Sequence, residues 1–190
     1  MARRPTTSTR RKTAKPAAAP EAKTAARGDE QLLTFLIGRD EYGISILRVR
    51  EIAEDRPLTP VPMRPQWMRG VMNLRGTVVP VVDLASKLGL GTTVISRFTC
   101  LIIVDLDVEG ESTVIAVMVD AVRRVVDVRG EDIQEAPPFG LELDIIPGMV
   151  RVDGELIVLL DLATILSERE LTGAAEVLPA LHDGGAVAHV

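Results

Sequence analysis

Short apolar runs alternate with polar turns along most of this chain, and this pattern predicts a protein built from strands. The run at 32–37 is followed by a polar turn at 38–41 and a return run at 42–46, which together indicate a β-hairpin. Val, Ile and Leu dominate such runs, and aromatic residues make up only 3% of the chain. Because β-branched side chains pack well on a pleated sheet, we expect an all-β fold with an aliphatic core.

The remainder of the chain carries signals of the same kind. In chain order, the expected elements are a strand or single helical turn at 47–54, a Pro-rich loop at 57–65, a short turn at 66–68, strands at 70–74 and 77–84, a short helix at 85–88, strands at 99–106 and 113–119 around a turn at 107–112, and closing segments at 150–160 and 161–166. Many short strands with Gly- and Pro-rich turns are typical of a small barrel or sandwich. A parallel α/β fold is disfavoured, because no crossover helix of useful length separates the runs.

The second half of this body repeats the first. Identical residues recur at a spacing of 78 positions, namely Gly70 and Gly148, Gly76 and Gly154, Asp83 and Asp161, Leu84 and Leu162, Ala85 and Ala163, and Leu88 and Leu166. Upstream, Val49–Ile52 matches Val122–Val125 at a spacing of 73, so the second copy has a longer insert near 137–144. A repeat of this length indicates two copies of one supersecondary unit. We therefore expect two small barrels, roughly at 30–95 and 96–166.

Charge divides the chain into a basic start and an acidic body. Residues 1–28 carry eight basic residues and one acidic residue, a net charge of +7, whereas the remainder carries 14 basic and 26 acidic residues, a net charge of −12. The basic segment lacks Leu, Ile, Val and aromatic residues, so it cannot bury enough apolar surface to offset the entropy of ordering. We expect a disordered tail at 1–29, a folded domain at 30–166, and a polar tail at 167–190 with some helical character.

Few residues in the body could support catalysis or metal binding. Both histidines, His182 and His189, lie in the C-terminal tail, which argues against His-based acid–base or nucleophilic chemistry. The single cysteine, Cys100, cannot form an intrachain disulfide or supply a zinc site, and its apolar surroundings indicate an inert core thiol. No apolar run approaches the roughly 20 residues of a membrane span. The sequence favours a cytoplasmic, non-enzymatic protein with no catalytic residue, metal or cofactor.

Four polar residues of the body stand out by position. Asp83 and Asp161 each precede a short helix, and their recurrence in both copies favours a structural role as N-caps. Arg75 follows an apolar strand and precedes Gly76, so its guanidinium needs a polar partner or solvent. With Glu51, Arg75 would form either an exposed ion pair of little energetic value or a partly buried pair that shapes a recognition groove.

Several motifs, in this order and at these spacings, resemble the CheW family of bacterial chemotaxis coupling proteins. They are a Tyr-Gly-Ile hairpin return at 42–46, Val-x-Glu-Ile at 49–52, a Pro-x-Pro loop before Trp67, Gly-Val-x-Asn-Leu-Arg-Gly at 70–76, Pro-Val-x-Asp-Leu at 80–84, Val-Asp-x-Val-x-x-Val at 119–125 and Leu-Leu-Asp-Leu at 159–162. Each motif alone is weak, but together they are highly specific and cover about 30–166. The resemblance implies two packed, five-stranded SH3-like barrels with short helices at their ends, in agreement with the repeat.

The resemblance also implies partners and the residues that contact them. Members of this family bind the regulatory domain of a chemotaxis histidine kinase and the cytoplasmic signalling tip of a methyl-accepting chemoreceptor. The implied assignments are receptor binding for Arg75, Glu51, Val122 and Val125, kinase binding for Val49 and Gly70, and a structural motif for Asn73, Gly76, Asp83, Gly154 and Asp161. A groove with an apolar floor and a few polar groups suits an amphipathic helix. For Val49, Val122 and Val125, plain core packing is an equally good interpretation.

The leading hypothesis is therefore a non-catalytic adaptor that couples receptor tips to the kinase in cytoplasmic receptor arrays. The alternative is a coupler of a chemosensory-like pathway that controls gliding, pili or development, with a basic tail at 1–28 that binds nucleic acid or anionic surfaces. The tail has no aromatic residue for base stacking, so such contacts would be weak and electrostatic. The sequence does not name the receptor, the kinase, the signal or the oligomeric state.

Overall fold

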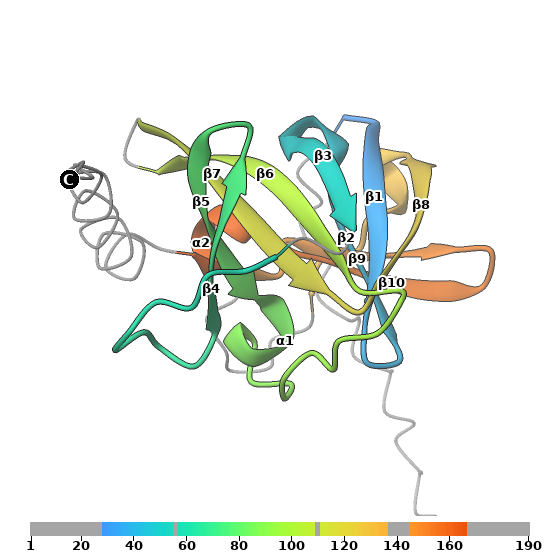
Figure 1. The fold of residues 1–190 in the computed structure, drawn as a ribbon. Coiled ribbons are helices and arrows are strands. Elements are labelled where there is room, and N and C mark those ends of the chain that lie inside the picture. Colours follow the sequence, from blue (N-terminus) through green and yellow to red (C-terminus); the bar gives the residue numbers. More distant parts are fainter. Residues whose placement is uncertain (1–27, 55–56, 109–110, 137–144, 167–190) are drawn as a thin grey trace, which may run out of the picture.

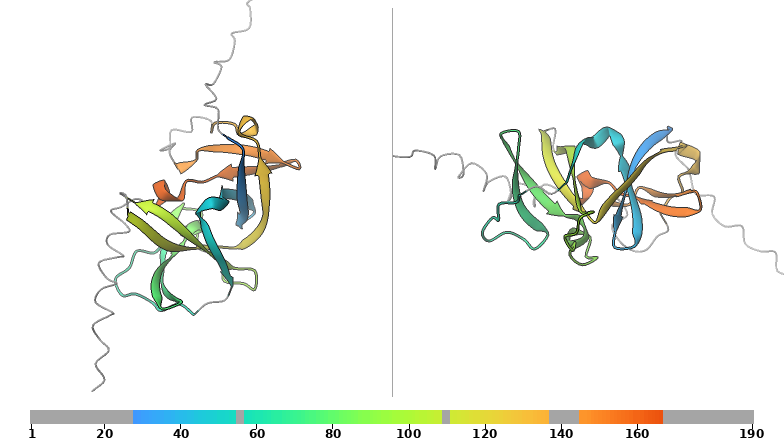
Figure 2. Two further views of the ribbon diagram at one scale, coloured as in Figure 1. Left: turned by 90° about the horizontal axis from the view of Figure 1, so that it is seen from above. Right: turned by 45° about the vertical axis from the view of Figure 1, so that its right-hand side comes forward.

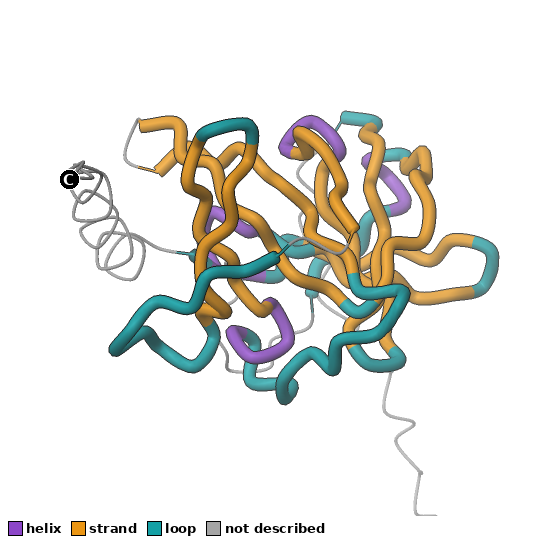
Figure 3. The backbone as a smooth tube through the Cα atoms, viewed as in Figure 1, coloured by secondary structure: helices purple, strands orange, loops and turns teal. Residues whose placement is uncertain are grey.

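The predicted all-β class is confirmed by the computed structural model, which describes residues 28–54, 57–108, 111–136 and 145–166 (Figure 1). Its strands are β1 (Glu30–Ile37), β2 (Asp40–Ser45), β3 (Val49–Glu54), β4 (Met68–Leu74), β5 (Thr77–Asp83), β6 (Cys100–Val108), β7 (Glu111–Val119), β8 (Ala121–Val128), β9 (Gly148–Val152) and β10 (Glu155–Leu159). Two short α-helices, α1 (Leu84–Lys87) and α2 (Leu162–Ile165), and two 3-10 turns, η1 (Ile46–Arg48) and η2 (Gly130–Asp132), complete the described part (Figure 3). The expected tail at 167–190, nearly all of the tail at 1–29 and the insert near 137–144 lie outside it.

The strands form two five-stranded sheets of identical topology. The first sheet has the order β8-β1-β2-β10-β9 and the second has the order β3-β6-β7-β5-β4. Most neighbours are antiparallel, but β10 pairs with β2 and β5 pairs with β7 in parallel. The two sheets curl into separate bodies that lie side by side (Figure 2). This arrangement matches the expected pair of small barrels. The helix α1 contacts β5 and β7, and α2 contacts β6, so both helices pack against strands of the second sheet.

The expected division of these barrels near residue 95 is wrong, because the two halves of the chain exchange hairpins. The first hairpin, β1–β2, joins β8, β9 and β10 of the second half, whereas the second hairpin, β6–β7, joins β3, β4 and β5 of the first half. The chain therefore enters the second sheet at β3 and returns to the first sheet at β8. Motif spacing reports how often a unit recurs, but it does not report which copy a strand pairs with.

Two local expectations also needed adjustment. The turn expected at 107–112 is shorter, since β6 and β7 pair as far as Val108 opposite Glu111. The stretch expected at 47–54 contains both proposed forms, because the η1 turn precedes the β3 strand. Extended hairpins tolerate polar residues near their ends where side chains reach solvent, so the polar composition of 107–112 gave a turn that is too long.

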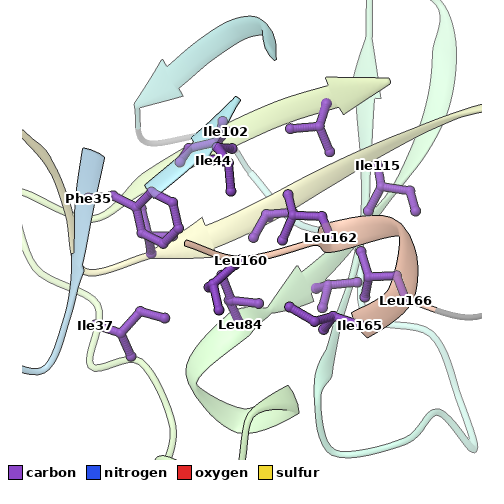
Figure 4. Packing of buried hydrophobic residues seen from close by; sticks show 14 of the residues in the cluster. Phe35, Ile37, Ile44, Leu84, Ile102, Ile115, Leu160, Leu162, Ile165 and Leu166 are labelled. Atoms are coloured by element: carbon purple, nitrogen blue, oxygen red, sulfur yellow. The ribbon is translucent and has the colours of Figure 1, made fainter. Parts of the chain in front are cut away.

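A central apolar cluster joins the two barrels. Phe35 and Ile44 of the first sheet meet Ile102 and Ile115 of the second, and all four are at most 3% exposed (Figure 4). Leu162, in α2, packs on the same cluster. Burial of a Val, Leu, Ile or Phe side chain contributes about 1.5–3 kcal/mol, so this cluster fixes the barrels against each other.

The sequence of β6 is an almost unbroken apolar run because both faces of this strand are buried. Ile102 and Val104 face the central cluster, whereas Leu101 and Ile103 face the interior of the second barrel. Side chains alternate between the faces of a strand, so a strand that is covered on both faces loses the alternating polar pattern. No helix among the described residues is long and apolar enough to cross a membrane.

Both predicted N-caps are confirmed, but they differ in their surroundings. Asp161 is exposed and accepts hydrogen bonds from the backbone N–H groups of Ala163 and Thr164. Asp83 caps α1 through the N–H of Ser86, yet its carboxylate is fully buried. It therefore needs further partners, and the sequence gave no signal for them.

The additional partners of Asp83 come from the loop that follows α1 and from β4. Thr93 donates to the Asp83 carboxylate through its backbone N–H at 3.1 Å and through its hydroxyl at 3.0 Å. The guanidinium of Arg69 lies 3.6 Å from the same carboxylate. Asp83 thus ties α1, β4 and the loop together, which is a larger structural role than a cap.

Candidate partner-binding surface

The edge strands β3 and β8 carry most of the residues for which the sequence implied partner contacts. Glu51 and Val49 lie on β3, at the edge of the second sheet, and Val122 and Val125 lie on β8, at the edge of the first sheet. Val49 and Val122 are half-buried against the central cluster, so both act in core packing. Val125 instead leaves 49% of its surface exposed. Of the three predicted valines, Val49 and Val122 therefore pack at the edge of the core, and Val125 is exposed to solvent.

Glu51 and Arg75 form the expected ion pair. The Nη2 atom of Arg75 lies 2.5 Å from Oε2 of Glu51, and the Arg75 side chain is 82% exposed whereas that of Glu51 is 25% exposed. Oε1 of Glu51 is buried and has no hydrogen-bond partner among the described residues. In this pair the Arg75 side chain is thus exposed to solvent, whereas the Glu51 side chain is largely covered and one of its carboxylate oxygens has no hydrogen bond.

The backbone at Arg75 is unusual for an arginine. Arg75 has φ of 54° and Gly76 has φ of 93°, so both central residues of the β4–β5 hairpin turn are left-handed. Such turns favour Asn-Gly or Asp-Gly, and a left-handed residue other than Gly costs roughly 1–2 kcal/mol. Asn73 supports the turn by accepting a hydrogen bond from the N–H of Gly76 at 2.8 Å. Arg75 thus holds a backbone conformation that Asn, Asp or Gly would adopt at lower cost.

Gly70 has a steric role that its position in the motif did not reveal. A Cβ atom at Gly70 would lie 2.4 Å from the carbonyl oxygen of Thr59, and the φ of Gly70 is +146°. Thr59 exchanges two backbone hydrogen bonds with Val71, at 2.8 and 2.9 Å. Only glycine allows the loop after β3 to approach β4 this closely. Val49 and Gly70 lie in one sheet, but on β3 and β4, which are its opposite edges in the order of pairing.

An exposed apolar region of the second barrel was missed at the sequence level. Val94, Ile95 and Phe98 are more than half exposed in the loop that Asp83 anchors through Thr93. Ile95 also lines a groove of about 570 Å³ together with Leu58, Leu101 and Met118. The sequence could have indicated this region, because three large apolar residues in a loop are uncommon unless another surface covers them.

The described residues offer little chemistry beyond binding. They contain no group of three or more His, Cys, Asp or Glu side chains that could hold a metal ion. Cys100 is buried in β6, where its thiol contacts the carbonyl oxygen of Phe98 at 3.2 Å. Burial, and then the charge of Asp40, raise the pKa of Tyr42, so this phenol stays neutral and packs on Phe35.

The sequence and the fold match a family of known proteins. The model of the CheW-like domain matches residues 31–170. The chain belongs to the CheW-like domain family. It is 34% identical over 154 residues to a probable chemotaxis protein CheW of Rhizobium etli, covering 80% of this chain and 97% of the relative. It is 30% identical over 149 residues to the chemotaxis protein CheW of Bacillus subtilis, covering 76% of this chain and 92% of the relative.

A solved structure agrees with this CheW-like assignment. The scaffolding protein TtCheW from Thermoanaerobacter tengcongensis superposes with a TM-score of 0.66 at 27% sequence identity, covering 74% of this chain and 94% of that protein. Membership in the family and the all-β, SH3-like fold are therefore confirmed. The roles of individual residues in binding stay predictions.

Proposed function

We propose that this CheW-like chain is a non-catalytic chemotaxis adaptor that couples chemoreceptor tips to the regulatory domain of a histidine kinase. The names of its relatives and of its solved neighbour, a scaffolding protein, support the general role of a chemotaxis scaffold. The chain then works in cytoplasmic receptor arrays, where many weak contacts act together and each interface can be small.

The Glu51–Arg75 pair is the observation that carries the receptor part of this proposal. The guanidinium is 82% exposed, so it can donate hydrogen bonds to acceptors on a partner while Glu51 holds it in place. Ile52 on β3 and Val125 on β8 are each about half exposed and offer apolar contacts to a partner helix.

The kinase part of the proposal assigns Val49 and Gly70 to a second contact. Gly70 holds the loop around Thr59 against β4, so it shapes the outer edge of the second sheet. A larger residue there would push the loop away and change this edge. We therefore assign Gly70 an indirect role in kinase binding, through the position of the loop, whereas Val49 contributes from the flank of the core.

Binding of purified components tests the proposal. The full chain is titrated separately with a receptor cytoplasmic hairpin and with a kinase regulatory domain, and Arg75→Ala is compared with Arg129→Ala. Arg129 is a suitable control because it is also an exposed arginine in an ion pair, with Glu131 at 3.5 Å. We expect Arg75→Ala to weaken receptor binding about tenfold, equivalent to about 1.4 kcal/mol, and to leave kinase binding intact. Failure of the wild-type chain to bind either partner would refute the adaptor role, and equal effects of the two variants would refute the role of Arg75.

A further inference from the structure

A groove of about 570 Å³ opens at the end of the second barrel where β6 begins and β7 ends. Its buried apolar lining is Leu101 of β6 and Met118 of β7. Leu58, from the loop after β3, and Ile95, from the loop after α1, line it nearer the surface, and Ile95 is 66% exposed. The polar lining residues are Glu54, Ser96, Arg97 and Thr99. A hollow of this size and composition accommodates several side chains of a binding segment.

The loop at 88–99 forms one wall of this groove, and hydrogen bonds fix its backbone. Thr93 donates twice to the buried carboxylate of Asp83, and the N–H of Ser96 donates to the hydroxyl of Thr99 at 2.8 Å. The loop is therefore held in a conformation that leaves its large apolar residues exposed. Large apolar residues on a fixed loop indicate that another segment covers them.

The surface around the groove is basic, although the body as a whole is acidic. Residues 57–104 carry five basic residues and one acidic residue, a net charge of +4, whereas the remainder of 29–190 carries 9 basic and 25 acidic residues. The basic residues are Arg64, Arg69, Arg75, Lys87 and Arg97. The acidic residue, Asp83, is buried. The loops on either side of α1 run along the lower side of the second barrel in Figure 3, so this segment forms one side of the molecule. A segment that complements this side is both apolar and acidic.

Only one of the two chain ends outside the described residues has this composition. Residues 167–190 carry four acidic residues and one basic residue, a net charge of −3. Within them, Leu171, Ala175 and Leu178 are spaced by four and three positions, which places them on one face of an amphipathic helix. The tail at 1–28 lacks Leu, Ile and Val and has the same sign of charge as the groove surface. The C-terminal tail therefore complements the groove, whereas the N-terminal tail does not.

The starting point of the C-terminal tail also allows this contact. The tail follows Leu166 at the end of α2, and α2 packs against β6, the strand that contributes Leu101 to the groove. Twenty-four residues span up to roughly 80 Å when extended, so the tail can follow the surface of the barrel from α2 to the groove.

We propose that the segment 168–178 of this chain binds in the groove of its own second barrel. Its apolar positions cover Leu58 and Ile95, and its acidic residues lie toward Arg97. Because the segment is tethered, its effective concentration is high and a weak contact is enough to keep it bound. Leu58 adjoins Thr59, so the bound tail would compete with a kinase regulatory domain; this consequence, unlike the tail contact itself, rests on the proposed function.

Solvent accessibility of methyl groups in the full chain tests the contact. Methyl NMR of Ile, Leu and Met is recorded with a soluble paramagnetic agent that relaxes exposed methyl groups. The test variant combines Leu171→Ser with Leu178→Ser. The matched control combines Val187→Ser with Val190→Ser, which removes two apolar residues of the same tail outside the proposed segment.

We expect the test variant to expose Ile95. A groove that the tail covers at least half of the time is open for at most the other half, so the agent should relax the Ile95 methyl groups at least about twofold more strongly in the test variant than in the wild type. Leu47, which is 89% exposed, should be relaxed equally in both proteins. The control variant should behave as the wild type does.

Three results would overturn the proposal. The first is equal relaxation of Ile95 in the wild type and the test variant, which would mean that the groove is open to solvent. The second is an equal increase in the control variant, which would mean that the segment 168–178 has no special role. The third is protection of Ile95 that increases with protein concentration, which would mean that a second copy covers the groove.

The regulatory consequence is measured separately on the same proteins. The test variant should bind a kinase regulatory domain more tightly than the wild type and the control variant do. A wild-type chain and a test variant that both fail to bind the kinase domain would refute the proposed function, but they would leave the relaxation result and the tail contact unchanged.

Discussion

Replacing Gly70 with alanine should separate the structural demand of this motif from its role in binding. The new Cβ would lie 2.4 Å from the carbonyl oxygen of Thr59, and the backbone would have to hold a φ of +146° with a side chain. The strained conformation costs about 1–3 kcal/mol. Relief of the clash by moving the loop would sacrifice two backbone hydrogen bonds between Thr59 and Val71, each worth about 0.5–1.5 kcal/mol. We therefore expect the free energy of unfolding to fall by about 2–6 kcal/mol.

Gly38 provides the matched control for this measurement. It also has a positive φ, of +63°, but no atom lies within 4 Å of the Cβ that an alanine would add. Gly38→Ala should thus cost only the strained conformation, about 1–2 kcal/mol. Urea unfolding of the two variants and the wild type, with kinase binding measured on the folded proteins, gives the comparison. Equal losses of stability in both variants would refute the close approach of the loop as the reason for glycine at this position.

Further predictions concern the buried carboxylate of Asp83, the central apolar cluster between the barrels, and the basic tail at 1–28. Asp83→Ala should lower the free energy of unfolding by about 2–4 kcal/mol, because Thr93 and Arg69 lose a buried partner. Asp161→Ala should lower it by only about 1 kcal/mol, since this exposed residue acts only as a cap. Denaturant titration measures both values, and similar losses would contradict the larger structural role of Asp83. Ile102→Ala should lower the free energy of unfolding by about 2–5 kcal/mol, and a loss below about 1 kcal/mol would show that the central apolar cluster is loosely packed. Deletion of residues 1–28 should abolish any salt-dependent gel shift with nucleic acid; a shift that survives the deletion would assign binding to the acidic body.

The sequence predicted local structure well because local signals decide it. The alternating apolar runs and the caps at Asp83 and Asp161 depend on residues within a few positions of each other. The repeat and the motifs then identified the fold class, and the expected ion pair between Glu51 and Arg75 is present.

Features that depend on contacts between distant segments were not predictable in this way. The exchange of hairpins between the two halves leaves no local mark, because β2 and β7 have the same pattern whichever sheet they join. The burial of Asp83 depends on Thr93, which comes from a loop with no periodic signal. The exposure of Arg75 likewise follows from its place at a hairpin tip, whereas its position after an apolar strand left open a partly buried site.

The exchange of hairpins has a consequence for how the two barrels can evolve and unfold. Each sheet contains strands from both halves, and the central cluster joins Phe35 to Ile102 across them, so neither half can complete a core alone. Loss of either half of the chain would remove strands from both sheets, so we expect a single cooperative unfolding transition. The same interdependence fixes the positions of the turns while leaving their exposed side chains free to change. Arg75 and Asp153 accordingly carry opposite charges on the same backbone conformation, with φ of 54° and 52°, at equivalent turns of the two sheets.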